Sequence, residues 1–143
     1  MTQVKKLIFF ICLMSINLIS FAETCPNIAA IKHQTLKGWV AYDSEEGTVL
    51  SSKRAAQFNR LVEKFVLAEW KMNPVNKDGA IHCYYLDKTG SNLEAYLAKD
   101  HFEPVKNNKN YWYQVSGFTQ CAAGKSKCAF RKSISADPQL ARK

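Results

Sequence analysis

The stretch Gly-Ala-Ile-His-Cys-Tyr-Tyr-Leu-Asp, residues 79–87, decides the fold that this sequence predicts. It is rich in β-branched and aromatic residues and lies between Asp-Gly and Asp-Lys-Thr-Gly, so it predicts a short strand between two turns. Successive strand residues point to opposite faces, which divides the side chains into two sets: Ile81, Cys83 and Tyr85, and His82, Tyr84 and Leu86. Both sets are largely apolar, which indicates a central strand covered on two sides, with Cys83 buried.

The first 22 residues have the pattern of a secretory signal peptide. Lys5 and Lys6 precede an apolar run over residues 7–19, and small residues precede the expected cleavage site after Ala22. The alternative is an uncleaved membrane anchor, but the run is shorter than the roughly 20 apolar residues that a spanning helix needs. We therefore predict a cleaved signal peptide over residues 1–22 and a periplasmic or secreted protein.

Cleavage would leave 121 of the 143 residues, which is the length of one domain. We expect a single domain over residues 23–132 and a basic, frayed tail over residues 133–143. The full chain has 20 basic and 12 acidic residues, and loss of Lys5 and Lys6 would leave a formal charge of +6. Such a balance favours anionic partners. No second apolar run is long enough to span a membrane, so we expect no span after cleavage.

The rest of the chain predicts further short elements around the strand at residues 79–87. A helical turn is expected after Pro26 and a helix over residues 53–63, capped by Ser51 or Ser52. A surface loop is expected over residues 99–110. Strands are expected over residues 36–42, 48–50, 65–72, 92–98 and 111–115, and in a hairpin over residues 118–130. The sequence thus predicts an α+β fold that is mainly antiparallel β, as one small disulfide-stapled domain with one or two short helices.

Four cysteines remain after cleavage, an even number that is consistent with disulfides in an exported protein. Three pairings are formally available. Cys121 and Cys128 lie seven residues apart around a glycine-containing tip, which favours a local bond and leaves Cys25 with Cys83. The absence of a Cys-x-x-Cys pair argues against thiol redox catalysis, and the spacing argues against structural zinc.

We expect no catalysis, because the sequence has no nucleophile, acid or base in a recognisable constellation. His82 and Cys83 are neighbours, but strand alternation places their side chains on opposite faces. Glu45 and Glu46 are adjacent carboxylates in a predicted turn, and His33 and His101 lie in polar surroundings. We predict no catalytic residue, no cofactor and no metal.

A cluster of basic and aromatic residues near the C-terminus is the candidate partner surface. Its members are Lys106, Lys109, Tyr111, Trp112, Tyr113, Lys125, Lys127, Arg131 and Lys132. This mixture suits single-stranded nucleic acid, but an exported protein rarely meets that ligand, so we expect no nucleic-acid partner. The alternative is that the aromatic rings belong to the core and the lysines form a solvated rim. If the surface is functional, an anionic protein or envelope surface is the expected ligand.

One family resembles this pattern of cysteines and aromatic residues. The shared features are the signal peptide, Cys25-Pro26, Phe65-Val66-x-Ala68-x-Trp70, Cys83-Tyr84-Tyr85, Trp112, and Cys121 followed by Cys128-x-Phe130. These features resemble small secreted proteins of intracellular bacterial pathogens related to EirA, which are associated with type IV secretion. The resemblance implies a periplasmic, non-catalytic accessory protein that supports delivery of effectors into a host cell. It carries over no active-site residues.

We therefore expect a periplasmic accessory or binding protein whose partners are envelope or secretion-system proteins. The alternative is a secreted inhibitor of an exported hydrolase, similar in role to a lysozyme inhibitor. Residues 73–79 or 99–110 would then be the loop that plugs the active site of the enzyme.

Overall fold

The computed structural model describes residues 21–75, 78–106 and 110–134. Most of the predicted signal peptide, Lys109 and the tail from residue 135 lie outside these ranges, so signal cleavage and the predicted fraying stay predictions. None of the helices in the described ranges has the length and apolar character needed to cross a membrane.

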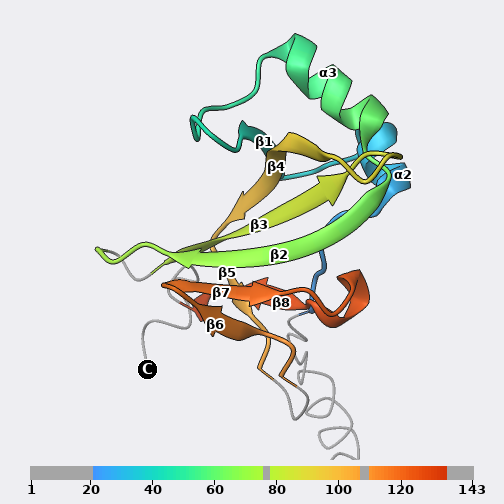
Figure 1. Ribbon diagram of the computed structural model, residues 1–143. Coiled ribbons are helices and arrows are strands. Elements are labelled where there is room, and N and C mark those ends of the chain that lie inside the picture. The colour runs from blue at the N-terminus through green and yellow to red at the C-terminus, as the bar shows by residue number, and fades with distance from the viewer. Residues whose placement is uncertain (1–20, 76–77, 107–109, 135–143) are drawn as a thin grey trace, which may run out of the picture.

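Six antiparallel strands form the main sheet (Figure 1), with β3 in the interior of the strand order β1-β4-β3-β2-β7-β6. Cys83 lies at its middle, opposite Ala68 on β2 and Leu97 on β4. The α+β, mainly antiparallel prediction is therefore confirmed. The strands are β1 (Val40–Asp43), β2 (Lys64–Met72), β3 (Gly79–Leu86), β4 (Asn92–Asp100), β6 (Tyr113–Val115) and β7 (Phe118–Cys121).

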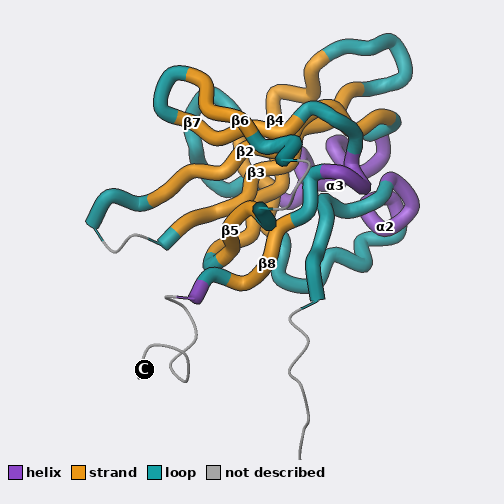
Figure 2. The backbone as a smooth tube through the Cα atoms, turned by 90° about the horizontal axis from the view of Figure 1, so that it is seen from below, coloured by secondary structure: helices purple, strands orange, loops and turns teal. Residues whose placement is uncertain are grey.

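A second layer packs against the Cys83 face of this sheet. It consists of the two-stranded ribbon of β5 (Phe102–Pro104) and β8 (Phe130–Lys132) and of two helices, α2 (Ile28–Lys32) and α3 (Ser52–Leu61). Figure 2 shows the ribbon beside the main sheet and the two helices together at one end. The largest core side chains come from both layers: Ile31, Phe58, Tyr85, Leu97, Phe102 and Phe130.

Each helix is preceded by a residue whose side chain accepts a hydrogen bond from a backbone amide in the first turn of the helix. The Ser51 hydroxyl accepts a hydrogen bond from the Arg54 amide at 3.3 Å, which confirms one of the two predicted caps of α3. Asn27 caps α2 in the same way, by accepting from the Ala30 amide at 2.7 Å. The helical turn expected after Pro26 is therefore present.

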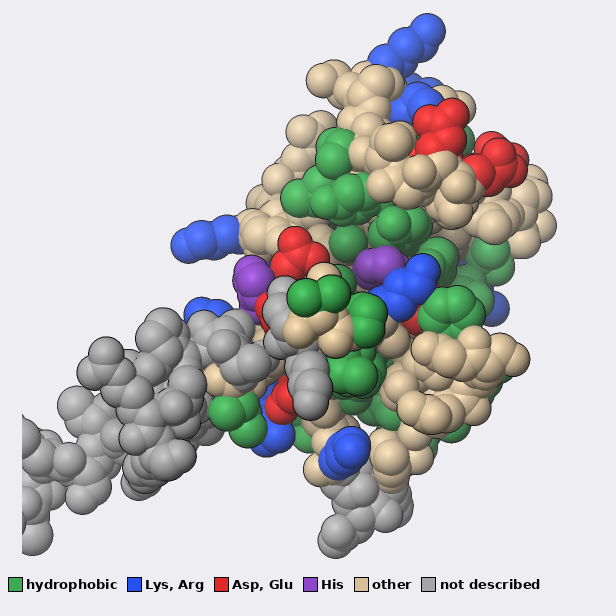
Figure 3. All heavy atoms as spheres, turned by 90° about the vertical axis from the view of Figure 1, so that its left-hand side faces the viewer, with side chains coloured by type: hydrophobic (Ala, Val, Ile, Leu, Met, Phe, Trp, Pro, Cys, Tyr) green, Lys and Arg blue, Asp and Glu red, His purple; other side chains and the backbone are tan. Residues whose placement is uncertain are grey.

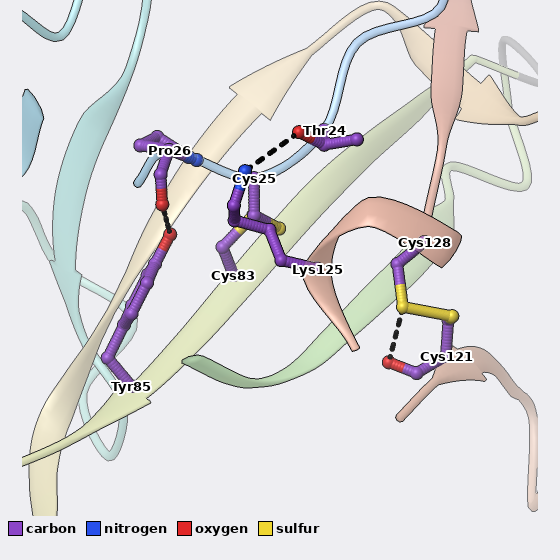
Figure 4. Close-up of a disulfide and its surroundings, with 8 residues drawn as sticks. All are labelled: Thr24, Cys25, Pro26, Cys83, Tyr85, Cys121, Lys125 and Cys128. Carbon is purple, nitrogen blue, oxygen red and sulfur yellow. Dashed lines mark hydrogen bonds between the residues drawn. A yellow bond between two sulfur atoms is a disulfide. The ribbon is translucent and has the colours of Figure 1, made fainter. Parts of the chain in front are cut away.

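Both predicted disulfides are confirmed: Cys25–Cys83 and Cys121–Cys128. All four cysteines are buried. Figure 4 shows that Tyr85, two residues after Cys83 on β3, reaches the same N-terminal segment, where its hydroxyl donates to the Pro26 carbonyl at 2.7 Å. Burial raises the pKa of Tyr85, so this hydroxyl keeps its proton. The N-terminal segment is therefore held to the middle of the sheet by one covalent bond and one hydrogen bond.

The predicted hairpin over residues 118–130 is wrong. β7 pairs with β6 and β2, whereas β8 pairs with β5. The tight turn lies earlier, at Ser116 and Gly117, which have φ angles of 42° and 89° and join β6 directly to β7. Positive φ at both turn residues matches the right-handed twist of paired strands. A 3₁₀ turn, η1 (Lys125–Lys127), lies between the two bonded cysteines.

Other predicted boundaries also change. Residues 99–110 are not a surface loop throughout, because they contain the end of β4 and all of β5, and Phe102 is only 7% exposed. The strand expected over residues 36–42 begins at Val40, and the one over residues 48–50 is reduced to an isolated bridge between Val49 and Tyr42. β3 is fully buried on one face only; on its other face, residues 82, 84 and 86 are half-buried.

The two disulfides differ in the length of chain that they close, which gives a stability prediction. They join residues 58 and 7 apart. The chain-entropy account then gives about 4 kcal/mol for the longer loop and about 2.5 kcal/mol for the shorter one. We expect the Cys25→Ala/Cys83→Ala variant to lose more unfolding free energy in urea than the matched Cys121→Ala/Cys128→Ala variant. Equal losses would contradict this account.

Candidate functional site

The structure divides the predicted basic and aromatic surface. Trp112 is only 5% exposed, and its Nε1 donates to the Ala129 carbonyl at 3.0 Å, so its ring belongs to the core. The Lys127 ammonium lies 5.2 Å from the centre of the Tyr111 ring, and Lys125 donates to the Thr24 hydroxyl at 3.3 Å. Both lysine side chains therefore already have contacts within the protein. Lys109 lies outside the described residues.

Four members of that surface do come together, in a cleft of about 530 Å³ between the β6–β7 hairpin and the β5–β8 ribbon. We call this space the inter-sheet cleft. Its lining residues include Trp70, Glu103, Lys106, Trp112, Tyr113 and Arg131. Lys132 belongs to the ribbon but does not line the cleft.

The second candidate surface is the face of the main sheet opposite Cys83. Antiparallel partners that lie directly opposite each other share a face, so the strand register identifies its members. Along this face, only Ala98 and Glu69 fall in the buried class. We call it the tyrosine face and define it by six half-buried residues from five strands: Tyr42, Leu67, His82, Tyr84, Tyr96 and Phe118.

Three rings of the tyrosine face pack around a fourth, two of them stacked on it and one tilted. Tyr96 on β4 is central: its ring centre lies 5.6 Å from that of Tyr42, 4.5 Å from that of His82 and 5.5 Å from that of Tyr84. Tyr42 and Tyr96 are nearly parallel, at an interplanar angle of 12°. Figure 3, which views the molecule from the side of the β2–β3 turn, shows hydrophobic side chains around a surface histidine, with basic side chains beside it.

An acid–base pair lies within this face. Glu69 is 8% exposed, and its Oε1 lies 3.8 Å from Nδ1 of His82 on the neighbouring strand. Gln120 of β7 donates to the other carboxylate oxygen at 3.2 Å. Burial lowers the pKa of His82; the charge of Glu69 opposes this shift without cancelling it. Burial also raises the pKa of Tyr84, and the nearby Glu69 charge adds to the effect.

The sequence pattern could have revealed part of this face. A β2–β3 hairpin that pairs Met72 with Gly79 necessarily places Glu69 opposite His82. That pair was missed because His82 was considered only with its sequence neighbour Cys83. Strand alternation correctly separates those two side chains, since Cys83 lies in the core and His82 lies on the tyrosine face.

A third cluster joins His101, Asp78 and Ser133. His101 Nδ1 contacts one oxygen of the Asp78 carboxylate, and the Ser133 hydroxyl donates to the other at 2.7 Å. Burial alone would raise the pKa of Asp78, but hydrogen bonds from Ser133, His101 and the Gly79 amide outweigh it and lower that pKa. The serine donates to the carboxylate and not to the histidine, so the cluster does not have the geometry of an activated nucleophile. It connects the β2–β3 turn to the ends of β4 and β8.

The acidic residues of the β1 turn line a shallow hollow of about 580 Å³ with the start of α3. Its central carboxylate, Asp43, already contacts Arg54 and the amides of Glu45 and Glu46. Hydrogen bonds from the Glu46 amide, the Arg54 side chain and the Glu45 amide lower the pKa of Asp43. The Asp43 carboxylate therefore already has its hydrogen-bond partners within the protein.

Within the described ranges, no group of three or more His, Cys, Asp and Glu side chains is arranged to hold a metal ion. In comparisons with known proteins, no family model, curated protein or solved structure matches this chain.

The lowered pKa of His82 predicts a pH-dependent stability. Because the unfolded chain takes up a proton near the ordinary histidine pKa of about 6.5, and the folded protein does so only at lower pH, acid favours unfolding. The free energy of unfolding should therefore fall as the pH drops from 7.5 to 5.5. We expect His82→Gln to show a smaller fall in urea titrations, whereas His33→Gln, which changes an exposed histidine, should keep the original slope. Equal slopes for all three proteins would contradict the assignment.

Proposed function

We propose that this protein is an exported, non-catalytic binding protein that docks on a second envelope protein through the tyrosine face. The observation that carries the proposal is the packing of two tyrosine rings against Tyr96, with Tyr42 stacked on it and Tyr84 tilted at 40°, on a face that no described element covers. Tyrosine is enriched at protein interfaces, because its ring supplies a large contact area and its hydroxyl tolerates water. Rings already ordered by stacking lose little further conformational freedom on binding.

The charges around this face favour a protein as the occupant. Lys64 and Lys71 lie on the same face as Glu69 and Asp100, so the two signs are mixed. A nucleic-acid platform combines aromatic rings with a positively charged groove that follows the phosphates, and such a groove is missing around these residues. A mixed polar rim around aromatic side chains is typical of protein–protein interfaces.

The proposed compartment is the periplasm or the extracellular space. Two buried disulfides fit an oxidising compartment, and the first 22 residues have the pattern of a signal peptide. The proposed partner class, a type IV secretion component, depends on the resemblance to EirA-related proteins alone.

Photo-crosslinking in intact cells that carry the protein tests the docking face. We expect a photoreactive amino acid in place of Leu67 or Tyr96 to yield an adduct with an envelope protein, identified by mass spectrometry. The same amino acid in place of Ala56, an exposed residue of α3, should yield none. An adduct with secretion-apparatus proteins would support the type IV role, and an adduct with a soluble hydrolase only would favour the inhibitor role instead.

A charge substitution provides the matched control for this experiment. Leu67→Asp places an uncompensated carboxylate in the middle of the tyrosine face, and we expect it to reduce the Tyr96 adduct at least tenfold. Val75→Asp makes the same chemical change at a side chain that is 91% exposed in the β2–β3 turn, and should leave the adduct intact. Failure to form any adduct from the tyrosine face, or equal effects of both variants, would contradict the docking proposal.

A further inference from the structure

We propose that the inter-sheet cleft binds an extended, acidic peptide segment, which adds to the free edge of β6 and inserts one large apolar side chain between the two sheets. This site is separate from the proposed docking face. Among its lining residues, Trp70, Gln114 and Thr119 lie on the ribbon side of the main sheet, whereas the register places Tyr113, opposite Gln120, on the side of the tyrosine face. The proposal therefore does not depend on the proposed function.

The cleft offers a rigid apolar floor. Trp70 donates its indole N–H to the Phe102 carbonyl at 2.8 Å, and Trp112 donates its own to the Ala129 carbonyl at 3.0 Å. Both polar atoms of the floor are thus satisfied within the protein. The half-buried Trp70 ring offers mainly apolar surface to an occupant, and Trp112, which is 5% exposed, lies beneath the cleft with most of its ring in the core. A Cβ added at Gly79 would lie 2.2 Å from Nε1 of Trp70, so the Trp70 ring packs directly on the backbone of Gly79. The volume of about 530 Å³ is in the range of ligand pockets.

The wall next to the floor ends in β6, an edge strand of the main sheet. β6 is the last strand in the order of the main sheet and pairs only with β7 among the described strands (Figure 1). In an antiparallel pair, alternate residues exchange both backbone hydrogen bonds with the partner strand. The two-residue turn after Val115 makes Val115 and Phe118 such a pair, so the backbone N–H and C=O of Gln114 point away from β7. Such an edge accepts an added strand.

The side chain of Gln114 connects this edge to the cleft. Gln114 and its partner Thr119 both line the cleft, on the same side of the sheet as Trp70, which is paired with Thr119. A peptide strand placed beside β6 would project every second side chain to that side. One of these side chains would enter the cleft over the Trp70 and Trp112 rings.

Three charged residues line the cleft, Lys106, Arg131 and Glu103, and their net positive charge favours an acidic peptide. Lys106 lines the cleft and is exposed, and Arg131 lies on the ribbon wall. Arg131 uses its Nε to donate to the Glu103 carboxylate at 3.0 Å, and the terminal nitrogens of the guanidinium add further donors. A carboxylate two residues from the inserted side chain would lie on the same side of the peptide and meet this rim. The positive net charge of the whole chain also favours an acidic ligand.

Binding of a synthetic peptide to the purified protein tests the proposal. The probe is acetyl-Thr-Val-Phe-Thr-Asp-Val-amide, in which Phe and Asp occupy alternate positions. Two-dimensional ¹H–¹⁵N NMR observes the indole N–H groups of all three tryptophans separately. We expect saturable shifts of the Trp70 and Trp112 signals, whereas Trp39, which packs on Phe130 and does not line the cleft, should not move. Saturable shifts centred on Trp39, or no shift at millimolar peptide, would overturn the proposal.

Variants and modified peptides separate the contributions. Lys106→Glu should weaken binding about fivefold and favour a peptide with Lys in place of Asp, whereas Lys88→Glu in the β3–β4 turn should leave the affinity unchanged. A peptide that is N-methylated at the residues whose backbone N–H groups point toward β6 should lose binding. It lacks the donors for the backbone hydrogen bonds that would extend the sheet. Equal affinity of the protein for the Asp and Lys peptides, or unchanged affinity after N-methylation, would contradict the peptide-binding proposal. Leu67→Asp should leave the peptide affinity unchanged, which distinguishes this site from the docking face.

Discussion

The disulfide between Cys25 and Cys83 is the constraint on which the rest of the structure depends. Cys83 lies at the middle of the central strand, so the bond holds the N-terminal segment across one face of the main sheet. The Tyr85 hydroxyl adds a hydrogen bond to Pro26, and α2 begins directly after this point. That face thereby becomes the core. On the opposite face, the side chains of the tyrosine face stay half-buried.

This asymmetry explains why both candidate surfaces are where they are. The tyrosine face results from the uncovered side of the sheet, where stacked rings and the Glu69–His82 pair remain near solvent. The inter-sheet cleft lies on the covered side, between the β5–β8 ribbon and the β6–β7 hairpin. One surface is aromatic with mixed charges, and the other is a cleft whose charged lining residues carry a net positive charge. They are suited to different ligands.

Local signals account for the parts of the fold that were predicted correctly. Ser51 and the helical spacing that follows it define α3, and the Asp-Gly turn with its flanking strands defines the β2–β3 hairpin. The close spacing of Cys121 and Cys128 led to both disulfide pairs. The errors occur where distant segments compete for one partner. β8 was expected to pair within the hairpin over residues 118–130 but pairs with β5, where Arg131 lies opposite Glu103. The Ser-Gly turn that joins β6 to β7 was the local signal that was overlooked.

The sequence by itself determined the fold class, the central strand, the disulfide framework and the separation of His82 from Cys83. These features follow from hydrophobic periodicity, turn residues and cysteine spacing. Such signals can be read within a few residues of sequence or by counting cysteines. Only the tertiary structure decided that Tyr42 stacks on Tyr96, that Trp70 and Trp112 form the floor of one cleft, and that the predicted basic cluster is divided. Those contacts depend on strand order and on the pairing of remote segments, and the free energy of such pairings is not encoded in any single stretch of sequence.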